Sequence, residues 1–171
     1  QMCIRDRNRV GTRTHQRSIG SKSTLQDLEK WMNTLIETND WGVGMTHGLT
    51  YGYDAFRNPQ RLWDHWDQVK ARENEIWVGT FREVASYIRE REETKLDVVN
   101  KKNTLLITPE LKLDQKLFVE PLTMVITGKD IKKVTVKQGK RKLPVQVTGD
   151  KVLFDFDPYG DVIKVTLKSR K

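Results

Sequence analysis

The sequence has very little cysteine and no long hydrophobic run. Its one cysteine, Cys3, excludes an intramolecular disulfide and a zinc site built from several thiolates. A membrane-spanning helix needs about 20 consecutive apolar residues, and no stretch of this sequence approaches that length. The opening residues are charged and lack the apolar core of a secretory signal. Internal repeats and low-complexity tracts are also missing, so the composition is that of a globular protein.

The first residues differ from everything that follows them. The segment Gln1–Arg7 (QMCIRDR) resembles a read-through peptide found at the ends of translated metagenomic assemblies. We therefore expect residues 1–17 to be artefactual or irregular and leave them out of the predicted fold. Since Cys3 lies in this segment, we also expect no cysteine catalysis in the rest of the chain.

Charge is distributed unevenly along the sequence. The formal net charge is +8. Basic and acidic residues nearly balance through residue 92, whereas lysine dominates beyond it. The residue pattern changes at the same place, from helical spacing to strict alternation. We therefore predict two domains, covering residues 18–93 and 94–171.

The first domain alternates between helical and strand patterns. Ser23-Thr-Leu-Gln26 is a capping-box pattern and predicts the start of a helix. The apolar face predicted for this helix is Leu25, Leu28, Trp31, Met32, Leu35 and Ile36. Residues 41–46 then read as a strand, and Asn58-Pro59 as the start of a second helix.

The same domain continues with a short strand and a third helix. Residues 76–79 suit a buried strand, and the third helix has an apolar stripe at Phe81, Val84, Ala85 and Ile88. The order helix–strand–helix–strand–helix is typical of parallel strands covered by helices, an α/β arrangement. Four tryptophans are expected to pack in the core: Trp31, Trp63, Trp66 and Trp77.

The second domain has the pattern of an all-β fold. Short segments alternate apolar and polar residues and are separated by turn signals such as Gln138-Gly-Lys140 and Thr148-Gly-Asp150. This spacing predicts an antiparallel β-sandwich of about six or seven strands.

The strand predicted over residues 41–46 ends in a histidine. Because Trp41-Gly-Val-Gly-Met is apolar or glycine, His47 would emerge where a buried strand meets a loop. Imidazole exchanges protons near neutral pH, and catalytic side chains collect at the carboxyl ends of strands in α/β enzymes. His47 is therefore the main candidate for catalysis, and a structural histidine is the alternative.

Two motifs in residues 18–92 look familiar: Met45-Thr-His47-Gly48 and Thr80-Phe-Arg-Glu-Val-Ala-Ser-Tyr87-Ile. The first resembles an apolar-x-His strand end and the second a barrel-closing helix, both typical of the polysaccharide deacetylase family, the NodB-like chitin, peptidoglycan and xylan deacetylases. The resemblance implies the C-terminal part of a deformed β/α barrel, followed here by the β-sandwich.

The family removes acetyl groups from carbohydrates with a divalent metal, commonly zinc, held by an aspartate and two histidines. By this resemblance His47 protonates the departing amine or alcohol. The family's Asp-Asp segment and H-x-x-x-H metal motif have no counterpart in this sequence. We therefore expect no metal and no activity in this fragment alone, and zinc in the full-length enzyme.

The resemblance also implies an acetylated carbohydrate polymer as partner, and a periplasmic, cell-envelope or secreted location. It leaves open N- against O-deacetylation, the particular polymer and the oligomeric state. Tyr53 and Asp54, in the loop after His47, are candidates for contacting sugar or orienting the imidazole, although Gly52 and Asp54 also fit a simple turn. His65 is expected to pack inside a helix, and His15 to have no catalytic role.

A lysine-rich stretch allows a second interpretation. It comprises Lys129, Lys132, Lys133, Lys137, Lys140, Arg141 and Lys142. Such a cluster either contacts a polyanion or forms the solvated face and edge of a sheet, and from sequence we favour the second. No aromatic residue interleaves these lysines, so nucleic acid is not expected as a partner. The alternative function is a non-catalytic β-sandwich that binds a glycan or another polyanion.

Overall fold

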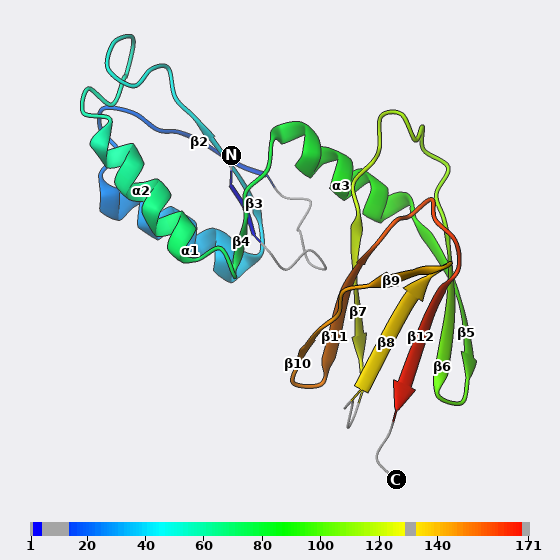
Figure 1. Ribbon diagram of the computed structural model, residues 1–171. Coiled ribbons are helices and arrows are strands. Elements are labelled where there is room, and N and C mark those ends of the chain that lie inside the picture. The colour runs from blue at the N-terminus through cyan, green and yellow to red at the C-terminus, as the bar shows by residue number, and fades with distance from the viewer. Residues whose placement is uncertain (1, 5–13, 129–132, 169–171) are drawn as a thin grey trace. The chain divides into compact units, whose positions relative to one another are not determined.

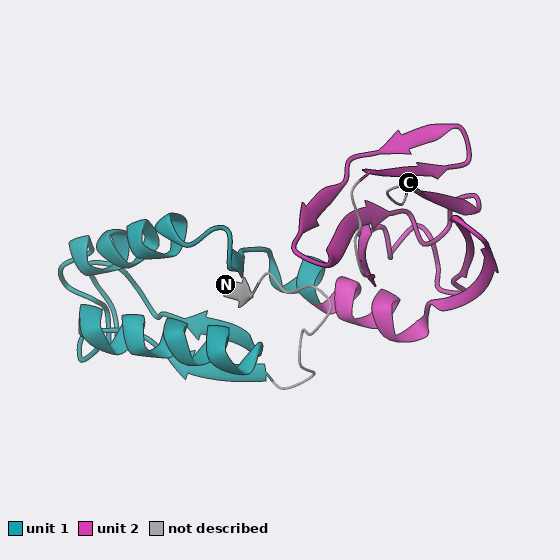
Figure 2. Ribbon diagram, turned by 90° about the horizontal axis from the view of Figure 1, so that it is seen from below, with its two compact units in different colours: residues 1–84 teal, residues 85–171 magenta. Residues whose placement is uncertain are grey.

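The computed structural model describes residues 2–4, 14–128 and 133–168 (Figure 1). Contacts divide the chain into two compact units, residues 1–84 and 85–171 (Figure 2). The fold mixes helices with sheets, as expected. The division falls inside the third helix rather than after it, where the sequence predicts the boundary. None of the described helices is long and apolar enough to span a membrane.

The first unit contains a four-stranded sheet and two complete helices. In chain order the elements are β1 (Met2–Ile4), β2 (Thr14–Ser18), α1 (Leu25–Thr38), β3 (Trp41–Met45), α2 (Gln60–Ala71) and β4 (Ile76–Trp77). The strand order is β2-β3-β1-β4. Strands β2 and β3 are parallel, and β1 pairs antiparallel with both β3 and β4. The described strands therefore form an open mixed sheet.

The structure differs from the expectation that residues 1–17 are irregular. Strands β1 and β2 both begin inside this range, and β2 pairs with β3 from Thr14 opposite Trp41 to Ser18 opposite Met45. The β2 sequence, THQRS, has no apolar residue, so its strand structure comes from backbone pairing and leaves no hydrophobic pattern to read.

Helix α1 is capped one residue later than the sequence predicts. Its N-cap is Thr24, whose hydroxyl accepts the N–H of Asp27 at 3.1 Å while the Asp27 carboxylate accepts the N–H of Thr24 at 3.1 Å. Aspartate thus completes the capping box expected of Gln26. Ser23 instead accepts the N–H of Gly20 at 3.1 Å and holds the preceding loop.

The predicted apolar face of α1 packs against α2 and β3. Leu28, Trp31, Met32 and Leu35 are buried. A Cβ atom on Gly42 would lie 2.3 Å from a Leu35 methyl carbon, so glycine at this position allows α1 to lie close to β3. Among the tryptophans expected in the core, Trp63 is 46% exposed because it lies on the solvent side of α2.

The third helix, α3 (Phe81–Glu93), buries only part of the predicted stripe. Phe81 is exposed, whereas Val84 and Tyr87 are buried. Glu90 is buried as well, and its carboxylate accepts the N–H of Glu120 at 3.1 Å. Burial raises the pKa of Glu90 to about 7; the N–H of Glu120 opposes this rise, and the charges of Glu120 and Asp157 add to it.

The second unit consists of two antiparallel sheets. Their strands are β5 (Lys95–Lys101), β6 (Thr104–Glu110), β7 (Leu122–Thr127), β8 (Lys133–Gln138), β9 (Arg141–Leu143), β10 (Gln146–Thr148), β11 (Lys151–Phe156) and β12 (Ile163–Lys168). One sheet has the order β5-β6-β12-β8-β9 and the other β10-β11-β7. Strand β11 contacts β8 and β9 of the larger sheet.

Alternation along several of these strands builds the core of the second unit, whereas β5 and β10 are exposed throughout. Residues of one parity are buried, including Val136, Phe154, Phe156, Ile163 and Val165. Residues of the other parity are exposed and mostly polar, which is the pattern expected of sheets with one solvated face.

Candidate functional site

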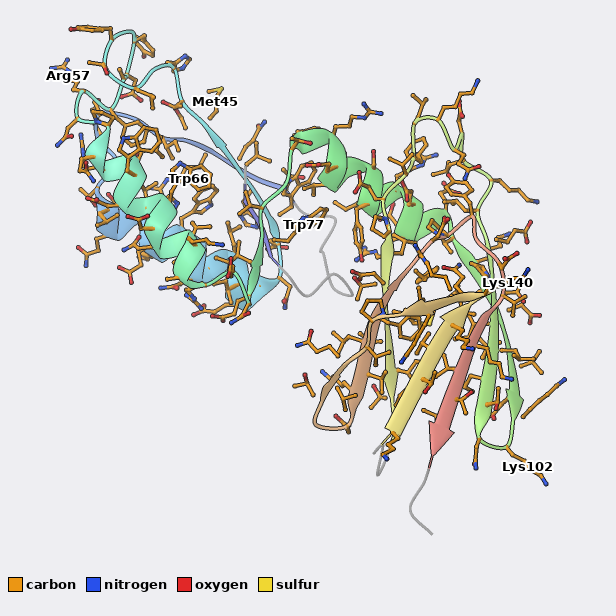
Figure 3. All side chains as sticks on the ribbon, in the orientation of Figure 1. Met45, Arg57, Trp66, Trp77, Lys102 and Lys140 are labelled. Carbon is orange, nitrogen blue, oxygen red and sulfur yellow. The ribbon has the colours of Figure 1, made fainter. Side chains whose placement is uncertain are left out.

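The candidate site lies at the carboxyl ends of β2 and β3. Because these strands are parallel, the loops that follow them leave from the same edge of the sheet. The pairing extends one step past the strands, where the N–H of Ile19 donates to the carbonyl of Met45 at 2.8 Å. Figure 3 labels Met45 at this end of β3. The two loops, residues 20–23 and 46–56, are thereby brought together although they are distant in sequence.

His47 is exposed in the second of these loops. Its ring meets the ring of Tyr53 edge to face, with centroids 5.4 Å apart. Tyr53 is 83% exposed and Tyr51 88% exposed. The site therefore presents an imidazole and two phenol rings to solvent, on the edge where the sequence predicts His47 to emerge.

Asp54 contacts the other loop. Its Oδ1 accepts the hydroxyl of Ser21 at 2.6 Å and the N–H of Ser21 at 3.1 Å. These hydrogen bonds, led by the hydroxyl, lower the pKa of the Asp54 carboxyl; desolvation opposes them, and the nearby charge of His47 adds to the lowering. Asp54 is therefore held as a carboxylate between Ser21 and His47.

The backbone at Asp54 packs tightly against the first loop. The Asp54 carbonyl accepts the N–H of Ser21 at 3.3 Å. A Cβ atom on Gly20 would lie 2.0 Å from that carbonyl oxygen, so only glycine allows the two loops to approach this closely. Asp54 itself has a φ of 50°, in the left-handed region that aspartate tolerates better than most residues.

Arg61 ties both loops to helix α2. Its guanidinium donates to the carbonyls of Ser21 at 3.3 Å, Ser23 at 2.9 Å and Phe56 at 2.8 Å. Sequence analysis identifies neither Arg61 nor Ser21. Arg61 sits on the polar side of an amphipathic helix, and its partners are backbone carbonyls, which leave no mark on the sequence.

The other two histidines lie away from this edge. His15 Nε2 is 2.8 Å from Asp40 Oδ2, near the amino ends of β2 and β3 and so at the opposite edge of the pair. His65 is 2% exposed inside α2, as the sequence predicts, and desolvation lowers its pKa. The Gln68 side chain opposes this lowering of the pKa.

The described residues do not fit a catalytic metal. Nowhere among them do three histidine, cysteine, aspartate or glutamate side chains come together as a metal-binding group. His15 and Asp40 pair without a third ligand of this kind, and His47 has Tyr53 and Asp54 as neighbours.

Comparisons with known proteins add little. No protein-family model and no curated protein matches the sequence. Among solved structures, the chain aligns with the α-fucosidase of Thermotoga maritima at 11% identity and a TM-score of 0.29. Its complexes with a mechanism-based inhibitor and with fucose align at TM-scores of 0.27 and 0.25. Each alignment covers 90% of this chain and 39% of the fucosidase, so the chain spans about two fifths of that enzyme's length. Scores this low establish no common fold.

Proposed function

We propose that this chain is the C-terminal part of a polysaccharide deacetylase, in which His47 donates a proton to the leaving group. The observation that carries the proposal is the exposed imidazole at the carboxyl end of β3, beside the end of a parallel neighbour. In this proposal residues 18–93 are the last portion of a deformed β/α barrel and residues 94–171 form a β-sandwich. A periplasmic, cell-envelope or secreted location accompanies the proposal, since the polymers concerned lie outside the cytoplasm.

The role of His47 follows from the chemistry of the leaving group. When an acetyl group is hydrolysed from a sugar, the departing amine or alcohol leaves poorly unless it receives a proton. An imidazolium can give that proton near neutral pH. Tyr53 packs against the edge of the imidazole and limits its orientations.

The exposed phenols are suited to a sugar ring. Tyr51 and Tyr53 present apolar faces and hydroxyl groups beside His47, and aromatic rings of this kind combine packing area with hydrogen bonding. In the proposal Tyr53 contacts the sugar that carries the acetyl group. Asp54 acts through His47 and through the loop, since Ser21 already occupies its Oδ1.

The proposal is tested in the full-length enzyme that contains this chain. Acetate release is measured on acetylated chitooligosaccharides, peptidoglycan and acetyl-xylan, for the wild type and for His47→Gln. We expect His47→Gln to lower kcat by about two to four orders of magnitude. His15→Gln is the matched control, because His15 lies at the opposite edge of the same strands, and it should keep near-normal turnover.

Two results would contradict the proposal. Near-normal turnover in His47→Gln removes the assigned proton donor. A wild-type protein that binds these polymers but releases no acetate from any of them favours the non-catalytic glycan-binding alternative. The DNA upstream of this chain offers a further check, because a deacetylase should encode an H-x-x-x-H segment after an Asp-Asp run.

A further inference from the structure

Three lysines form a lateral row on the larger sheet of the second unit. Lys164 on β12 is paired with Lys137 on β8, and Lys137 is paired with Lys142 on β9. All three are exposed. Neighbouring strands are about 4.8 Å apart, so the first and last positions of this lysine row are about 10 Å apart. The row runs across the strands and not along any one of them.

The protection of sheet edges does not explain the lysine row. Lysine is common on edge strands because it discourages pairing with other chains. Strand β12, however, is hydrogen bonded to β6 and β8, and β8 to β12 and β9. Lys164 and Lys137 therefore lie inside the sheet. Like charges placed directly opposite one another destabilise a sheet, so this arrangement costs stability.

Among the described residues, no ion pair involves the lysine row, although Asp155 and Asp157 line a pocket with Lys142 at its β9 end. On the described parts of β8, β9 and β12, the outward positions carry only lysine and threonine; beside the lysine row these include Lys133, Thr135 and Thr166. The described ion pairs of this unit lie elsewhere, at Arg89–Glu93 and Glu110–Lys112. Two lysines of the predicted cluster, Lys129 and Lys132, lie outside the described residues.

We propose that this outer face, with Lys137, Lys142 and Lys164 at its centre, is a docking surface for an anionic polysaccharide. A polymer with recurring carboxylate groups can lie along the row and relieve the repulsion between its lysines. The hydroxyl groups of Thr135 and Thr166 lie in the next row and can bond to sugar hydroxyls or carboxylates. This inference concerns the second unit alone and does not depend on the proposed catalytic role of His47.

A polysaccharide fits this face better than a nucleic acid does. No aromatic residue occurs in β5, β6, β8, β9 or β12, so there is no platform on which bases could stack. A broad five-stranded sheet does not enter a DNA groove, which admits a helix or a two-stranded ribbon.

Binding of the whole chain to polygalacturonate tests the proposal. Fully methyl-esterified polygalacturonate is the neutral control, since it keeps the polymer backbone without the charges. Affinity is measured at several salt concentrations by titration calorimetry. The test variant replaces Lys137, Lys142 and Lys164 with glutamine. The control variant replaces Lys30, Lys102 and Lys116 with glutamine. These three lysines lie outside the row, so the control loses the same net charge as the test variant. Lys102 is labelled in Figure 3.

We expect the wild type to bind polygalacturonate with an affinity that falls as salt is added, and not to bind the methyl-esterified polymer. The row variant should bind about tenfold or more weakly, with a smaller salt dependence, and the control variant should stay within about twofold of the wild type. Equal losses in the two variants would show that net charge alone drives binding and would overturn the proposal. So would equal binding of the ester, no binding of polygalacturonate, or tighter binding of duplex DNA at the same charge concentration.

Discussion

The hydroxyl of Ser21 donates to the carboxylate of Asp54 at 2.6 Å, and this bond joins two loops through residues that are 33 positions apart in sequence. Each loop follows one strand of a parallel pair, so this bond fixes their relative position at the edge where His47 emerges. The carboxylate reaches Ser21 through both its hydroxyl and its N–H. Loop geometry at the candidate site therefore depends on a charged group.

Asp54→Asn should loosen this junction. An amide oxygen accepts hydrogen bonds less strongly than a carboxylate, so the thermal midpoint should fall relative to the wild type at pH 7. Because its folded pKa is lowered, Asp54 contributes stability that is present above about pH 4 and is lost as the pH falls through the folded value. Thermal melts at pH 7 and pH 3 should show the two proteins converging in acid. A constant difference between them would contradict this role.

Arg61→Lys should loosen the two loops of the candidate site. A lysine ammonium cannot hold three carbonyls in the fork geometry of a guanidinium. We expect a loss of about 1–3 kcal/mol in the free energy of unfolding, measured by urea denaturation. Arg82→Lys, at an exposed position near the start of α3, is the control and should change stability very little. Equal stability in the two variants would mean that the Arg61 hydrogen bonds contribute nothing net.

Gly42→Ala should separate α1 from β3. The new methyl would lie 2.3 Å from a carbon of Leu35, which is only 2% exposed and has little room to move. Overpacking of this kind costs about 1–3 kcal/mol, measurable by urea denaturation. The control is Gly44→Ala on the same strand, because its Cβ would come no closer than 3.3 Å to a methyl carbon of Ile19. A neutral Gly42→Ala would show that the helix shifts freely.

Glu90→Gln should change how stability depends on pH. The buried Glu90 keeps its proton up to about pH 7, whereas the unfolded chain releases it near pH 4.5. The folded state thus binds more protons between these values, and stability falls as the pH rises through them. The variant avoids this loss, and it should melt several degrees above the wild type at pH 8 and close to it at pH 4. Parallel melting curves at both values would contradict the buried carboxyl's role.

The lysine row should lower the stability of the folded protein by a measurable amount. Replacing Lys137, Lys142 and Lys164 with glutamine removes two directly opposed like-charge pairs, each worth about 0.2–1 kcal/mol. The variant should therefore melt above the wild type in low salt. The difference should shrink as salt screens the charges. A variant less stable than the wild type would mean that these lysines support the sheet.

Some features of the fold follow directly from residue spacing. Helix α1 shows this best, because its apolar positions recur every three or four residues and four of them are buried. Strand β2 could not be predicted in the same way, since THQRS carries no apolar alternation and is held by backbone pairing. In α3 the apolar Phe81 is predicted to be buried but is exposed, whereas the polar Glu90 is buried.

The candidate site shows the same limit. The position of His47 just after β3 could be predicted, because a run of apolar and glycine residues leads directly to it. The roles of Arg61 and Ser21 could not be predicted. Arg61 donates to a backbone carbonyl, and Ser21 bonds to Asp54 in a loop that follows a different strand. In the second unit, sequence proximity grouped Lys140 with Lys137. The strand register instead places Lys164 beside Lys137, a neighbour that can be found only from the pairing of β12 with β8.

The lysine row also bears on how copies of the protein behave together. Two such faces repel each other within a Debye length, about 8 Å at physiological salt, so stacking of copies through this sheet is disfavoured. A polyanion longer than one row would overcome this repulsion, because a single polymer chain could bind several copies of the protein side by side. The polymer would then set the valency of the assembly, and clustering should peak at an intermediate ratio of polymer to protein and dissolve when either is in large excess.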